Sequence, residues 1–246
     1  MSNVNKKENP IVGWIKHLLG RSAVVMLMYF AVSAAIIMLS MQDETLNYGK
    51  MMTVWGIGFA ILVAYNFFFV WVNAGADYEM LVSGNMKRRS LGEGSTLKIS
   101  SHKEYKEYRP WKGVVYAALP TLFTVIAAVI FGVNNQAINE TLKGGEPMQA
   151  SRGWLVFVGF LISGWSILPL YASNLVGMTP NYFLSILFIL IPLALSVAGY
   201  IGGAYAKRAK VMREQELQDK QREREAQKEK KANLGAVAGT SRKKRK

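Results

Sequence analysis

Few side chains in this sequence have both the type and the spacing that catalysis requires. The two histidines, His17 and His102, lie far apart in the chain, and there is no cysteine. The sequence contains no HExxH, GxxxxGK(S/T) or GxSxG motif. Its acidic pair, Asp43 and Glu44, falls in a short polar connection, where a solvated turn is the usual explanation. We therefore predict that the protein is not an enzyme and holds no metal or cofactor.

One cluster at the end of the chain has a chemistry suited to binding. It is the run of five consecutive cations Arg242, Lys243, Lys244, Arg245 and Lys246. Anionic lipid headgroups attract each nearby Lys or Arg by about 1 kcal/mol. Ribosomal RNA or another polyanion would bind the same cluster through counterion release. A third interpretation is a tail that only aids solubility and fixes topology, with no specific partner.

Two further features suit contacts between helices inside a membrane. Gly199 and Gly203 form a GxxxG spacing, which lets two helix backbones approach closely. Asn66 lies within a long apolar block, where an amide most often forms a hydrogen bond to another helix. These residues predict helix packing, either within the protein or against another membrane subunit.

Long apolar blocks decide the fold class. Five of them contain no Asp, Glu, Lys, Arg or His, and they cover residues 22–41, 51–73, 113–133, 154–172 and 181–206. A helix needs about 20 apolar residues to cross a membrane. The first block is longer than a signal-peptide core and is followed by no cleavage pattern. We therefore predict an all-α, polytopic membrane helix bundle in the cell membrane, with a retained first span.

The distribution of Lys and Arg predicts the topology. Basic residues are retained on the cytoplasmic side, and they are concentrated in segments 1–21 and 74–112, which hold four and eight of them. Residues from Ala206 on hold 15 Lys+Arg and 6 Asp+Glu within a chain of net charge +14. We expect this tail and the N-terminus to be cytoplasmic, which five full crossings do not allow. Block 154–172, rich in glycine, is our candidate for a re-entrant segment; five spans with an external tail is the alternative.

The segments outside the blocks have predicted structures of their own. Residues 11–19 (IVGWIKHLL) are amphipathic and predict an interfacial helix, with an N-terminal extension of the first span as the alternative. Residues 207–231 are rich in helix formers and predict a charged helical tail. Residues 232–246 predict a disordered basic end.

Together these features favour a non-enzymatic accessory or structural subunit of a membrane complex. Its basic tail would contact anionic lipid or a polyanion such as ribosomal RNA. The alternative is a permease-like component for a small neutral or apolar solute, suggested by the possible re-entrant block. A membrane enzyme acting on lipid ranks lower, because it predicts an acid–base pair at the interface and the sequence shows none.

Overall fold

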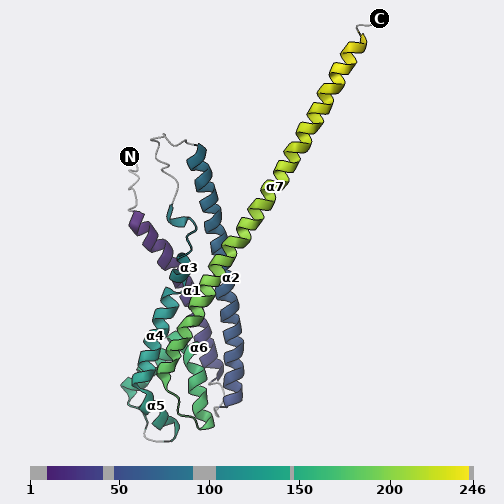
Figure 1. Cartoon of the computed structure of the whole chain (residues 1–246). Coiled ribbons are helices and arrows are strands. Elements are labelled where there is room, and N and C mark those ends of the chain that lie inside the picture. The colour runs from purple at the N-terminus through teal and green to yellow at the C-terminus, as the bar shows by residue number, and fades with distance from the viewer. Residues whose placement is uncertain (1–9, 41–46, 91–103, 145–146, 244–246) are drawn as a thin grey trace, which may run out of the picture. The chain divides into compact units, whose positions relative to one another are not determined.

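The computed structural model describes residues 10–40, 47–90, 104–144 and 147–243 and divides into two compact units. Unit 1 reaches Ala204, and unit 2 begins at Tyr205. All regular structure in the described ranges is helical, in this order: α1 (Pro10–Ser40), α2 (Tyr48–Ser90), η1 (Glu104–Lys106), α3 (Lys112–Tyr116), α4 (Ala118–Val133), α5 (Asn135–Leu142), α6 (Ala150–Ser173), η2 (Asn174–Val176), η3 (Tyr182–Ile189) and α7 (Leu190–Lys243). Figure 1 shows this order by colour.

Four helical segments are long and apolar enough to cross a membrane. They are Ile11–Ser40, Tyr48–Gly84, Ala150–Val176 and Tyr182–Lys228. A fifth candidate is the pair α4 and α5, which is bent by 64° at the break between the two helices. The predicted fold class, an all-α polytopic membrane bundle with five apolar segments, is confirmed.

The first helix is longer than the apolar block that predicts it. α1 begins at Pro10, a residue suited to the first turn of a helix, and continues without a break to Ser40. Residues 11–19 are therefore the first part of α1, as in the alternative of an N-terminal extension, and not a separate helix.

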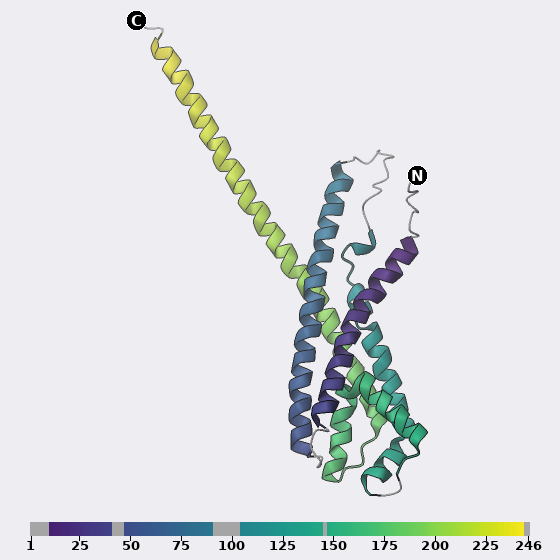
Figure 2. The ribbon, with the colours of Figure 1, turned by 180° about the vertical axis from the view of Figure 1, so that it is seen from behind.

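α1 and α2 lie side by side and antiparallel (Figures 1 and 2). Where Gly58 of α2 faces Ile36 of α1, a Cβ on the glycine would lie 2.7 Å from the isoleucine side chain, so the two helices approach closely there. At the end of unit 1 that we call the charged end, Arg21 of α1 meets Asp77 of α2. The opposite end, where α1 ends and α2 begins, is the distal end.

α4 and the first part of α7 connect the same two ends. The backbone N–H of Leu119 donates to Ser22 Oγ at 3.0 Å, which fixes the start of α4 at the charged end. The ring of Phe183, in η3, lies against Gly132 at the end of α4. α7 follows from this distal position and returns to the charged end, where Tyr200 meets Asp77.

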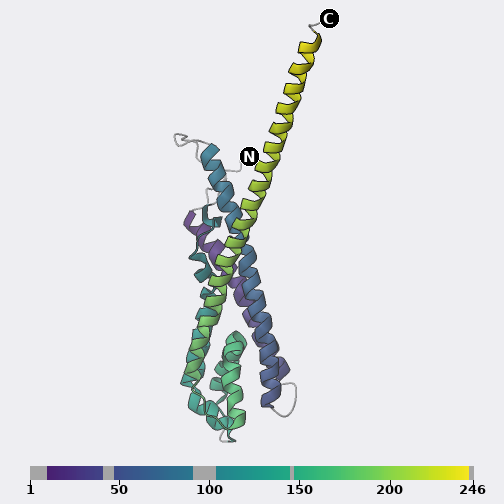
Figure 3. The same cartoon turned by 45° about the vertical axis from the view of Figure 1, so that its right-hand side comes forward.

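α6 folds back on itself instead of crossing unit 1. Its backbone leaves helical geometry at Ser163, with φ −149° and ψ 35°. The rings of Phe160 and Tyr171 lie 5.0 Å apart, whereas eleven residues of straight helix would separate them by about 16 Å. Each half has about 10–13 residues and is too short for a hydrocarbon core about 30 Å thick. Figure 3 shows α6 confined to the lower part of unit 1.

This geometry fits the predicted arrangement of four crossing segments and one re-entrant segment. By length and composition alone α6 also qualifies as a span, so the distinction depends on the break at Ser163 and on the ring contact.

The last helix extends beyond its predicted end. α7 continues through residue 231 to Lys243, whereas the sequence predicts disorder from Ala232. Residues 232–243 contain Ala, Leu and Val, which a helix accepts, and two glycines that cost about 1 kcal/mol each.

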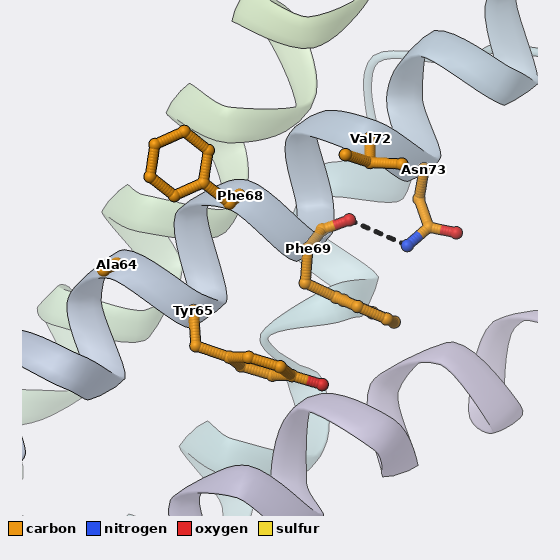
Figure 4. A pocket seen from close by; sticks show the side chains of 6 residues that line it. All are labelled: Ala64, Tyr65, Phe68, Phe69, Val72 and Asn73. Atoms are coloured by element: carbon orange, nitrogen blue, oxygen red, sulfur yellow. Dashed lines mark hydrogen bonds between the residues drawn. The ribbon is translucent and has the colours of Figure 1, made fainter.

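The outer face of α2 is apolar, as a lipid-facing surface requires. Figure 4 shows a shallow groove there, with Asn73 Nδ2 donating to Phe69 O at 2.7 Å, so the amide is satisfied within its own helix. Its lining comes from α2 alone: Ala64, Tyr65, Phe68, Phe69, Val72 and Asn73. Phe68 and Val72 are both more than 60% exposed, which suits contact with acyl chains.

Candidate functional site

A buried network of charged and phenolic groups lies at the charged end of unit 1. Asp77 is its centre: Arg21 Nη1 donates to both carboxylate oxygens at 2.8 Å. Tyr200 Oη donates to Asp77 Oδ2 at 2.7 Å, and Arg21 Nη1 also donates to Tyr116 Oη. The network therefore joins α1, α2, α3 and α7, which are distant in sequence.

Lys112 is the second cation of the network and is fully buried. Its Nζ lies 3.3 Å from Asp77 Oδ2 and donates to the carbonyls of Tyr105, at 2.8 Å, and Glu107. The three donors of the ammonium group thus have partners, as a buried charge requires. Tyr108 N also donates to the carbonyl of Asp77 at 2.9 Å, so segment 104–112 is fixed to α2 by both main chain and side chain.

Two cations share one carboxylate at this position. Burial lowers the pKa of Lys112, the carboxylate of Asp77 opposes that effect, and the like charges of Arg21 and Arg109 lower the pKa further. Asp77 is only 1% exposed, so it stabilises both cations away from water. Removing it would leave the buried ammonium of Lys112 and the partly buried guanidinium of Arg21 without their counter-ion.

Two tryptophan rings, Trp14 and Trp111, lie next to the cations of this end of unit 1. Trp14 and Trp111 stack with their centroids 5.6 Å apart. The guanidinium of Arg109 lies 5.2 Å from the Trp14 ring and the ammonium of Lys112 lies 5.3 Å from it, both within cation–π range. Tryptophan favours the headgroup layer of a membrane, so this level of the molecule suits the interface.

The turn of α6 has its own set of polar contacts. Trp165 N donates to Ser33 Oγ at 3.3 Å, and Trp55 Nε1 donates to Trp165 O at 2.7 Å. Ser163 Oγ lies 3.2 Å from Thr124 Oγ1. These bonds satisfy backbone and side-chain groups at the break, which is the condition for irregular backbone at membrane depth.

The residues predicted for helix packing all lie between helices of unit 1. Asn66 Nδ2 donates to Tyr29 Oη at 2.9 Å, and Ser196 Oγ donates to Asn66 Oδ1 at 3.2 Å, so the amide joins α1, α2 and α7. A Cβ on Gly199 would lie 2.9 Å from Phe67 O, and one on Gly203 would lie 2.2 Å from Trp71 O. α7 therefore contacts the backbone of α2 at both glycines.

The predicted basic cluster falls mostly outside the described residues. Arg242 and Lys243 fall in the last turn of α7, where the structure does not describe the side chains, and Lys244, Arg245 and Lys246 lie outside the described residues. Its binding to lipid or polyanion stays a prediction.

Sequence reasoning missed the charged network, although its members were visible. Arg21 is the last charge before the first apolar block, Lys112 is the last charge before the third, and Asp77 is the first acid after the second. The signal was this repeated placement of charges at block ends, which we read only as topology. Among the described residues, no group of three or more metal-ligating side chains comes together.

Comparison with known proteins adds no assignment. No protein-family model matches the chain, and neither the curated proteins nor the solved structures give a match.

Proposed function

We propose that this protein is a non-enzymatic, multispanning accessory or structural subunit of a membrane complex, with a basic tail that binds anionic lipid headgroups. The observation that carries the proposal is the position of Ala204. Tyr200 and Gly203 place the last turn of unit 1 at the charged end, beside Asp77 and Trp71. The tail, with 15 Lys+Arg and 6 Asp+Glu, therefore begins at the end that also carries Arg21, Lys106, Arg109 and Lys112.

The exposure of unit 2 supports a surface-binding role. From Tyr205 to Lys228 its charged side chains are exposed, apart from the half-buried Lys207. Lys210 and Glu214 form an ion pair at 3.9 Å, and exposed pairs of this kind contribute little. The exposed cations other than Lys207 therefore lie where headgroups can reach them.

A labelled tail tests the proposal directly. The chain has no cysteine, so an Ala236→Cys variant in nanodiscs accepts a single environment-sensitive fluorophore. We expect a blue-shifted emission in nanodiscs with anionic lipid, absent in purely zwitterionic ones and lost at about 0.5 M salt, where charges are screened. Replacing residues 242–246 by glutamine should abolish most of the shift. Equal emission in both lipids would overturn the proposal, and co-sedimentation with ribosomes without a lipid effect would replace lipid by RNA.

A second candidate function rests on the fold of α6. Broken backbone at membrane depth is tolerated where protein or a water-filled cavity covers it. Transporters use such broken helices to form their solute sites. This feature favours a permease-like component for a small neutral or apolar solute. Proteoliposomes that move none of a broad solute panel would count against it.

A further inference from the structure

Arg21 uses only part of its hydrogen-bonding capacity within the network. Its Nη1 serves Asp77 and Tyr116, whereas Nε and Nη2 have no partner within the described ranges. The Arg21 side chain is 19% exposed, whereas those of Asp77 and Lys112 are 1% and 0% exposed. A guanidinium group has five N–H donors, so Arg21 can donate further hydrogen bonds to a ligand that reaches the solvent-exposed part of its side chain.

Further cations lie around this side of the molecule. Arg109 is exposed, and Lys106 is half-buried in η1, which packs against α1 and α2. The neighbouring acids, Asp77 and Glu107, are buried, at 1% and 6% exposure. Glu79 is exposed, but it lies two residues after Asp77 and so about 200° around α2. The surface near Arg21 is therefore predominantly cationic.

The apolar surroundings suit a lipid molecule. Trp111 is 46% exposed in its stack with Trp14, at the level where tryptophan meets headgroups. Ile15 and Leu19 are exposed one turn apart on α1, at 52% and 50%, and precede the apolar block that begins at Ser22. Acyl chains can cover these side chains while a headgroup stays at the level of the cations.

We infer that the charged end of unit 1 carries a binding site for the phosphate of an anionic lipid headgroup, formed by Arg21, Lys106 and Arg109 beside Trp14 and Trp111. Guanidinium groups bind phosphate oxygens through two parallel N–H···O bonds, and the ammonium group of Lys106 adds a point charge. The site shares no residue with the cluster 242–246 and does not depend on the function proposed for the tail.

The test compares two double variants of the full-length protein, both with residues 242–246 already replaced by glutamine. One is Lys106→Gln with Arg109→Gln at the proposed site. The matched control is Lys143→Gln with Arg152→Gln, two exposed cations at the distal end. Native mass spectrometry from detergent micelles measures retained phosphatidylglycerol against phosphatidylcholine.

We expect the first variant to lose phosphatidylglycerol binding by about fivefold for each cation removed, and the control to keep it. Arg109→Gln alone, at an exposed position, should lose about fivefold even if the double variant folds poorly. Equal loss in the control would overturn the site. Displacement of the lipid by an equal concentration of inorganic phosphate would also overturn it, because the site would then belong to a soluble anion.

Discussion

At the scale of single residues, the strongest constraint in this protein is the carboxylate of Asp77. It accepts from Arg21, Lys112 and Tyr200, and each of these residues belongs to a different helix. Replacing a complete buried ion network by apolar groups can be neutral, but removing one partner leaves the others uncompensated. Asp77 should therefore matter more to stability than any other single charge in the described part of unit 1.

Asp77→Asn should lower the free energy of unfolding by about 3–5 kcal/mol, since it leaves two cations beside a neutral amide. Denaturant or thermal unfolding in detergent, followed by circular dichroism, measures the change. The matched control is Glu140→Gln, which removes an exposed carboxylate bonded to Gln136 at 2.8 Å and should cost under about 0.5 kcal/mol. Similar effects of the two variants would contradict a central role for Asp77.

The network shows why sequence alone identified charges but not a site. Asp77 lies 56 positions from Arg21, 35 from Lys112 and 123 from Tyr200. Their meeting depends on how four helices are aligned along the bundle, and nothing in the spacing of the chain specifies that alignment. Asn66 was easier to interpret, because one amide within an apolar block needs a partner wherever the neighbouring helix lies.

At the scale of elements, α6 is the segment whose form departs most from a simple span. Gly159 lies against the ring of Phe131, where a Cβ would come within 2.8 Å, so the first half of α6 packs tightly on α4. The second half returns, which brings Tyr171 to Phe160. Gly159 allows the close approach to α4, and the hydrogen bonds at the turn satisfy its polar groups. Both features favour a hairpin over a straight helix.

Cross-linking distinguishes the hairpin from a straight helix. In the cysteine-free chain, Phe160→Cys with Tyr171→Cys should form a cross-link rapidly with a short bifunctional thiol reagent, because the native rings lie 5.0 Å apart. Leu27→Cys with Met38→Cys is the matched control: both residues are exposed and eleven positions apart on the unbroken α1, about 16 Å along its axis. Gel mobility after cleavage at an engineered protease site between the cysteines reports the result. A cross-link in the control alone would refute the hairpin.

The apolar blocks predicted which segments are helical, and the helices extend beyond the blocks. Block 51–73 lies within α2, which runs from Tyr48 to Ser90, and block 22–41 overlaps α1, which begins at Pro10. Absence of charge marks where a helix contacts lipid, whereas the backbone continues as a helix into the polar layer for as long as its residues tolerate that geometry. The glycines of block 154–172 hinted at the break, but only the contacts of Ser163 and Phe160 locate it.

At the scale of the whole molecule, the turn of α6 bears on how many times the chain crosses the membrane, and we predict four crossings. Without α6, unit 1 crosses from the charged end to the distal end and back twice, through α1, α2, α4 with α5, and the η3–α7 segment. The chain thus enters and leaves at the same end. We therefore expect Arg21, Lys106, Arg109 and Lys112 to face the cytoplasm, the side that Lys and Arg prefer, and the tail to begin there.

Single cysteines at Thr179 and Ala236 test this arrangement. Thr179 is exposed in the connection between η2 and η3, at the distal end, and the tail follows the charged end. In intact cells, a membrane-impermeant maleimide should label Thr179→Cys, whereas Ala236→Cys should be labelled only after permeabilisation. A fifth crossing by α6 would move the tail to the outside, so that Ala236→Cys reacts in intact cells. A fifth crossing would also move Thr179 to the inside, so labelling of Ala236→Cys from outside with Thr179→Cys protected would reject the re-entrant hairpin and, with it, a tail facing cytoplasmic lipid.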